Sequence, residues 1–276
     1  MSDTPILHPE TQRLADENAL LREELTGLLT EADQLVHVVK PNLVAMYQAR
    51  IGAWELRLLR AQWEAARQRR EVEMIQAGLN RGQKPDLREI EGLLDLEFLG
   101  WQERVREAAE RLQAAEHRLK HLLPPAEDRE LKKLYYALVK RLHPDVNPLL
   151  TDDQQRLWRR AQEAYAAGDL NELRALALLA ERSGAIAPAP KSLDRLRAEQ
   201  AALTRQIAEM LKRIEQIEAA PPFTLRQQLE DDAWLARRRQ ELEAQIEQLR
   251  AQSKALAVHK QQLLSGGTYG TTFGKN

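Results

Sequence analysis

Three consecutive residues of this chain, His143, Pro144 and Asp145, have the types and order needed for a specific polar contact. Pro144 disfavours a helical conformation in the residue before it, so a helix arriving from the N-terminal side ends near His143. The imidazole and the carboxylate are then displayed on a loop. A carboxylate displayed in this way can form a charge-assisted hydrogen bond with a cationic group of a partner.

The segment that leads into this loop, from about Asp128 to Leu142, is predicted to be an amphipathic helix. Steps of three and four residues separate two of its faces. The apolar face carries Leu131, Leu134, Tyr135, Leu138 and Leu142. The other face is mostly basic and carries Arg129, Lys132, Lys133, Tyr136 and Lys140. A positively charged helix therefore runs directly into a loop that displays an imidazole and a carboxylate.

Two more short helices are predicted after the loop. Thr151 with Gln154, and Asp169 with Glu172, have the spacing of helix-capping pairs. Gly168 stands between the two helices and is expected to stop the first of them. The loop is thus enclosed by a small helical module.

Catalysis is not expected from these residues. A hydrolytic enzyme would need a nucleophile beside His143 or a bound metal, and the chain has no cysteine. His117 and His121 have the i, i+4 spacing of a zinc pair, but no nearby residue completes the pattern. We therefore expect no enzyme activity, no catalytic residue, no metal and no cofactor.

The loop and its two flanking helices resemble the J-domain, or DnaJ-like, family over about residues 128–170. That family has a helix ending in basic residues, a His-Pro-Asp loop and an antiparallel return helix with an Ala-Tyr pair. Trp158 stands where the family commonly has a Phe. The other matching residues are Lys132, Lys133, Tyr135, Leu138, Arg141, Asn147, Pro148, Glu163, Ala164 and Tyr165. The resemblance extends well beyond the tripeptide.

In that family, the loop and the basic helix dock on a DnaK-type (70-kDa heat-shock) chaperone and stimulate its ATP hydrolysis. The resemblance implies that Asp145 pairs with a basic residue of the chaperone, while rim charges mainly raise the association rate. The chaperone-binding residues it implies are His143, Pro144, Asp145, Lys132, Lys133, Lys140 and Arg141. The core of the module would consist of Tyr135, Leu138, Leu142, Trp158 and Tyr165.

The chain departs from the family pattern in several places. The initial short helix is missing before Asp128, and we expect the end of the preceding long helix, near Leu119 and Leu122, to pack in its place. The customary fourth helix is missing, and Tyr136 replaces a residue that is often basic. No Gly/Phe-rich linker, zinc module or β-rich client-binding domain is visible. The rest of the chain is therefore expected to bring the module to one client or structure.

The elements that must position this module are predicted to be helices. Charged residues make up 30% of the 276 residues and aromatic residues 5%. Leu, Ala, Glu, Gln and Arg dominate; they are strong helix formers, and β-branched residues are too sparse for strands. The predicted class is all-α, with long coiled-coil helical hairpins flanking the small J-domain-like module.

The first 40 residues carry a leucine repeat with a period of seven. The two apolar heptad positions include Leu14, Asn18, Leu21, Leu25, Leu28 and Leu35. Leucine at one position with a single polar Asn at the other favours a two-stranded parallel coiled coil. We expect a homodimer through residues 1–40; the alternative is that the stripe packs on the protein's own helices. Pro41 is expected to break or kink the helix.

The remaining segments complete the predicted organisation. Residues 41–123 form an antiparallel helical hairpin, and residues 124–182 form the J-domain-like module. Residues 183–191 form a linker, residues 192–264 a second coiled-coil hairpin, and residues 265–276 a disordered tail.

Charge and hydropathy restrict the partners and the compartment. The 41 basic and 42 acidic residues are intermixed, so neither nucleic acid nor an anionic membrane is expected as a partner. The longest apolar run, Ala175 to Ala180, is too short to span a bilayer, and no signal peptide is visible. The absence of cysteine suits the cytoplasm, which is the expected location. The protein client is unknown.

Two other classes of protein share such helices. A DNA-binding zipper would need a basic region before its leucine repeat, but Met1 to Arg13 holds a single Arg. A coiled-coil scaffold or adaptor with a non-functional J-like module predicts the same helices. Only the ATPase of the partner chaperone separates that scaffold from a working co-chaperone.

Overall fold

The computed structural model describes residues 9–183 and 192–266, and these ranges are all-α, with no strand among them. Residues 184–191 of the predicted linker and residues 267–276 of the predicted tail lie outside the described residues, as do residues 1–8. Across the described ranges, no helix has both the length and the apolar character needed to cross a membrane.

The chain divides into two compact units, each with a hydrophobic core of its own. Unit 1 is built from the chain up to Leu43 together with His121–Leu225. Unit 2 is built from Val44–Lys120 together with the chain from Arg226 onward. Each unit therefore combines segments that are far apart in the sequence.

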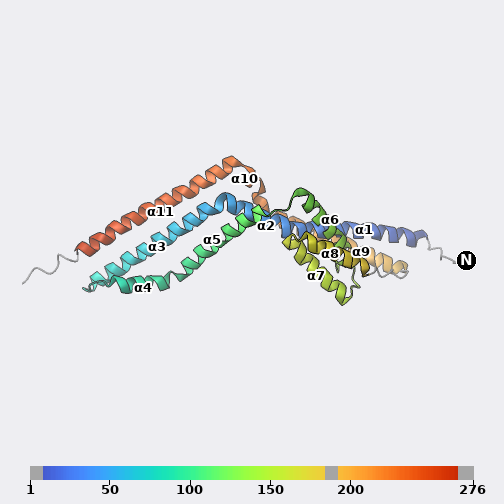
Figure 1. Ribbon diagram of the computed structural model, residues 1–276, viewed down its shortest axis with the longest axis horizontal. Coiled ribbons are helices and arrows are strands. Elements are labelled where there is room, and N and C mark those ends of the chain that lie inside the picture. The colour runs from blue at the N-terminus through green and yellow to red at the C-terminus, as the bar shows by residue number, and fades with distance from the viewer. Residues whose placement is uncertain (1–8, 184–191, 267–276) are drawn as a thin grey trace, which may run out of the picture. The chain divides into compact units, whose positions relative to one another are not determined.

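In unit 1, two long helices lie side by side and run parallel (Figure 1). They are α1 (Pro9–Gln34) and α9 (Leu193–Glu218). The Asn18 side chain donates a hydrogen bond to the Leu196 carbonyl at 2.9 Å, and one turn further along Arg22 forms an ion pair with Glu199. The apolar stripes of both helices contribute to one core.

The three short helices of unit 1 form the module that contains the loop. They are α6 (Pro125–Leu142), α7 (Asp152–Ala167) and α8 (Leu170–Arg182). Thr151 and Gln154 form a reciprocal capping box at the start of α7, and the Asp169 side chain caps α8. Gly168 ends α7 at φ 70°, in the left-handed region that favours glycine. The three helices pack on one another, and α6 also packs on α1.

Unit 2 is built around α3. Its helices are α3 (Ala53–Asn80), α4 (Leu87–Glu97), α5 (Leu99–Lys120), α10 (Arg226–Glu230) and α11 (Asp232–Gly266). The chain folds back after α3, so α4 and α5 run antiparallel to it (Figure 1). Helix α11 runs parallel to α3, with ion pairs Arg57–Glu243 and Glu71–Lys260 along the pair.

The predicted hairpin of residues 192–264 does not form. Its first half is α9, which packs on α1 in unit 1, and its second half is α11, which packs on α3 in unit 2. Leucine periodicity locates the apolar stripe of each helix, but a stripe does not specify its partner. Each stripe is buried against an earlier helix of the chain.

Of the break or kink expected at Pro41, the break is absent. The chain stays helical through α2 (Lys40–Tyr47), which is flanked by two π-helical segments, Leu35–Val39 and Gln48–Gly52. Pro41 stands two residues after the end of the first of these wider turns, in the first turn of α2. The local shift in the hydrogen-bond ladder relieves the clash that proline causes inside a regular α-helix.

Candidate functional site

The candidate site is the loop between α6 and α7, which contains the His-Pro-Asp sequence. His143 follows Leu142 and leaves the helical conformation at φ −73° and ψ 129°. The His143 carbonyl accepts hydrogen bonds from the backbone N–H groups of Val146 (3.1 Å) and Asn147 (2.8 Å). The Asn147 side chain also donates to the Lys140 carbonyl at 2.8 Å. These bonds fix the loop as a tight turn against the end of α6.

The His143 side chain lies against the module and is only 14% exposed. Its ring meets the Trp158 ring in an edge geometry, with centroids 5.0 Å apart. The Nδ1 atom accepts a hydrogen bond from the Asp145 backbone N–H at 3.0 Å. Burial lowers the pKa of His143 below its ordinary value of 6.5, against the opposing effect of Asp145 and Asp33. The imidazole is therefore neutral at pH 7, with its proton on Nε2.

Asp145, by contrast, displays its side chain, which is 51% exposed. Its Oδ2 atom lies 4.0 Å from Nδ1 of His143, beyond hydrogen-bond distance. Pro144, between them, is exposed as well. The loop therefore buries its imidazole and presents its carboxylate, which is the arrangement needed to pair with a cation on another molecule.

Stacked aromatic rings form the centre of the module and join α6 to α7. The Tyr135 and Tyr165 rings lie nearly parallel, with centroids 3.8 Å apart, and the Trp158 ring lies 5.8 Å from Tyr135. Leu138 and Leu142 are buried in the same core. All five residues expected in the core of the module thus lie there, and Trp158 joins this core to the imidazole of the loop through an edge contact.

Four basic residues were expected to bind a partner. Three of them, Lys132, Lys133 and Arg141, are either exposed or contact only residues of the module. Lys133 is exposed on α6. Lys132 forms an ion pair at 3.1 Å with Asp128, one turn earlier on the same helix. Arg141 donates a long hydrogen bond of 3.4 Å to the Ala180 carbonyl. The partly exposed Lys132–Asp128 pair and the long Arg141 bond are weak contacts, so these cations can also interact with an acidic partner.

The fourth basic residue, Lys140, is engaged by α1. Its ammonium group forms an ion pair with Glu23, and the Tyr136 hydroxyl donates to the same carboxylate. The hydrogen bonds from Lys140 and Tyr136 lower the pKa of Glu23. Burial, together with the bond to Glu23, raises the pKa of Tyr136 to about 12. Part of the basic face is therefore covered by the protein's own carboxylate.

Glu23 and Asp33 are site residues that the sequence does not single out. Asp33, also on α1, accepts a hydrogen bond from the Tyr135 hydroxyl at 2.6 Å. Both lie outside the two apolar heptad positions, on a second side of α1 where Thr26 and Thr30 are buried. Helix α1 packs on α6, whereas Leu122, which we expected to pack on the module, is exposed.

The residues assigned to a dimer seam lie inside unit 1. Leu14, Asn18, Leu25 and Leu35 are buried, and Leu21 and Leu28 pack against the core at partial exposure. The seam expected between two chains is thus occupied by α9 of the same chain.

The described residues contain no group of three or more His, Cys, Asp or Glu side chains that could hold a metal ion. His117 lies in the last turn of α5, and His121 follows that helix directly. Neither histidine is near the loop in the sequence, and the site consists of the His-Pro-Asp turn, its aromatic support and the basic face of α6.

In comparisons with known proteins, no protein-family model, curated protein or solved structure matches the chain.

Proposed function

We propose that the chain is a J-domain-like co-chaperone that docks on a DnaK-type chaperone and stimulates its ATP hydrolysis. The observation that carries the proposal is the contrast within the loop between a nearly buried imidazole and an exposed carboxylate. His143 is held against Trp158, while Asp145 presents its carboxylate at the end of a basic helix. A rigid loop with one outward carboxylate favours a specific contact, because little conformational entropy is lost on binding.

In this proposal each group has a separate role. Asp145 forms a charge-assisted hydrogen bond with a cationic side chain of the chaperone, and His143 and Pro144 hold the loop in shape. Lys132, Lys133, Lys140 and Arg141 form the rim and speed association with an acidic surface. None of these groups forms or breaks a covalent bond, so the ATP chemistry belongs to the partner.

The long helices would then serve to place the module. In unit 1 they support α6 directly, and in unit 2 they form an elongated helical surface suited to a protein client. We place this activity in the cytoplasm, because DnaK-type chaperones act there and a chain without cysteine is compatible with its reducing conditions.

The test is single-turnover ATP hydrolysis by a DnaK-type chaperone with the full chain, and with its His143→Gln and Asp145→Asn variants. Glu181→Gln, an exposed carboxylate on α8, is the matched control for loss of one charge. We expect stimulation by the wild type and the control, and none by the loop variants. Equal stimulation by all four proteins would remove the loop from the mechanism.

A second candidate is a coiled-coil scaffold whose J-like module does not act on a chaperone. The contact of Glu23 with Lys140 and Tyr136 favours it, because it withdraws part of the basic face from any partner. The scaffold predicts no stimulation by the wild type while a standard DnaJ stimulates in the same assay.

A further inference from the structure

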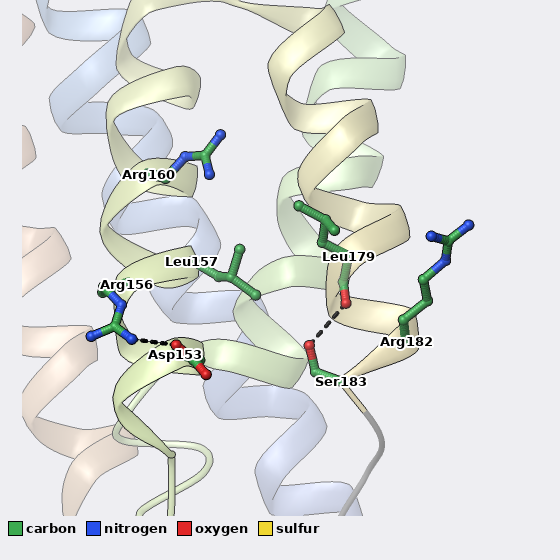
Figure 2. A pocket seen from close by; sticks show the side chains of 7 residues that line it. All are labelled: Asp153, Arg156, Leu157, Arg160, Leu179, Arg182 and Ser183. Atoms are coloured by element: carbon green, nitrogen blue, oxygen red, sulfur yellow. Dashed lines mark hydrogen bonds and ion pairs between the residues drawn. The ribbon is translucent and has the colours of Figure 1, made fainter.

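A groove of about 500 Å³ opens between α7 and α8 on the surface of unit 1. None of its residues belongs to the His-Pro-Asp loop or to the basic face of α6. It is lined by Asp153, Arg156, Leu157, Arg160, Leu179, Arg182 and Ser183 (Figure 2).

The floor of the groove is apolar. Leu157 extends from α7 and Leu179 from α8, and the two side chains point toward one another (Figure 2). Leu179 remains 41% exposed. An apolar side chain placed between these two leucines would leave water for hydrocarbon, at a gain proportional to the area covered.

Three of the lining side chains are arginines and one is a carboxylate, so the rim of the groove is mostly basic. Arg156 forms an ion pair with the exposed Asp153 of the same rim, and Arg160 donates to Glu172 from Nε (3.1 Å) and from Nη2 (2.5 Å). Arg156 and Arg160 are 66% and 54% exposed, so both pairs are screened by solvent and readily exchanged. Each guanidinium has five N–H donors, of which these contacts use a minority. The rim can therefore accept further carboxylates.

We propose that this groove binds an acidic peptide segment of a partner protein, with one leucine-like side chain on the floor and carboxylates at the arginines. The length of the groove favours a peptide over a small anion. From Asp153 to Arg160, α7 rises by about 10 Å, which equals about three residues of extended chain. The proposal stands apart from chaperone stimulation and does not depend on it.

The probe is a fluorescein-labelled peptide of sequence Glu-Asp-Leu-Asp-Glu, titrated with the full chain and followed by fluorescence anisotropy. Two further peptides test the chemistry: Glu-Asp-Ser-Asp-Glu lacks the apolar anchor, and Lys-Lys-Leu-Lys-Lys reverses the charge. We expect saturable binding of the first peptide that weakens with salt, and no saturation with the other two.

Two variants of the groove have close controls on the same helices. Arg156→Ser and Leu179→Ser change lining residues, whereas Arg159→Ser and Leu178→Ser change exposed neighbours that do not line the groove. Leu178 is the more exposed leucine, at 59%. We expect each groove variant to weaken binding about tenfold, as loss of a charge-assisted bond or a buried apolar contact does, and each control to bind like the wild type.

All four variants are checked for unchanged helix content and for unchanged stimulation of chaperone ATPase. Absence of saturable binding at millimolar peptide would overturn the proposal. So would equal binding of the serine peptide, or equal weakening by the control variants, because either result would mean that the groove is not the site.

Discussion

At the scale of single residues, the loop separates two tasks that its sequence places side by side. His143 contributes a fixed shape, since its ring lies on Trp158 and its Nδ1 accepts the backbone N–H of Asp145. Asp145 contributes the exposed charge. Under the proposed function, replacing His143 should therefore weaken docking indirectly, because it changes the position of Asp145.

The burial of His143 predicts how stability depends on pH. Its folded-state pKa is lowered, so the unfolded chain binds more protons between that value and about 6.5. This contribution to stability is present above about pH 6.5 and is lost as the pH falls through the folded pKa. When the pH is lowered from 7.5 to 5.5, the midpoint temperature of thermal unfolding should fall further for the wild type than for His143→Gln. An NMR titration midpoint of the imidazole above 6.5 would contradict the sign.

Replacing each of the two stacked tyrosines by phenylalanine should change the stability of the fold by different amounts. The Tyr135 hydroxyl donates to Asp33, whereas the buried Tyr165 hydroxyl has no hydrogen-bond partner among residues 9–183 and 192–266. Tyr135→Phe should cost about 1.5 to 3 kcal/mol, the usual contribution of a bond to a charged group. Tyr165→Phe should cost nothing or stabilise slightly. Hydrogen exchange of α6 and α7 amides measures both, and equal losses would refute the assignment.

At the scale of elements, α1 is the helix that connects the module to the rest of unit 1. One side of it packs on α9, and another side brings Glu23 and Asp33 to α6. The loop is thus supported by α7 from within the module, and the basic face is bounded by α1 from outside it.

Removing the carboxylate of Glu23 should release the basic face. Under the proposed function, Glu23→Gln raises the rate of association with the chaperone about two- to fivefold at low salt, the range of an exposed ion pair. The pKa of Tyr136 should also fall from about 12 toward its ordinary value, which ultraviolet titration of the phenol detects. Glu24→Gln, the adjacent exposed carboxylate, is the control. A fall in the association rate would show that Glu23 supports docking.

The elements near the loop were largely predictable from sequence, and the partners of the long helices were not. Thr151, Gly168 and Asp169 determine helix ends through their own backbone and side-chain chemistry, which is local and readable. The partner of α1 depends on which of several similar leucine stripes packs against it. Glu23 and Asp33 act through that packing, so no local signal marks them.

At the scale of the molecule, each unit carries its own core, and damage to one should spare the other. Ile75 is fully buried in unit 2, and Ile75→Ala should cost about 2 to 5 kcal/mol there. Amides of α3 and α4 should lose protection from hydrogen exchange. Amides of α6 to α8 should keep their protection, and under the proposed function chaperone stimulation should persist. Loss of protection in both units would show that they unfold as one.

The burial of the leucine repeat within unit 1 bears on the number of chains. With that stripe covered by α9, light scattering should give a mass near 31.6 kDa. Twice that mass would show that the heptads join two chains, as their spacing alone predicts. Deleting residues 1–40 distinguishes the two cases further, because it exposes α9 only where the pairing is internal.

The pairing of α1 with α9 also sets an order of events during synthesis. Asn18 and Leu196 are 178 positions apart, which a ribosome takes roughly 10 to 35 s to translate. Throughout that interval the leucine stripe of the nascent α1 is exposed without the helix that will cover it. An apolar stripe exposed for that long can aggregate or be bound by a chaperone. The newly made chain should therefore need a chaperone itself, the same kind of protein that its folded form is proposed to recruit.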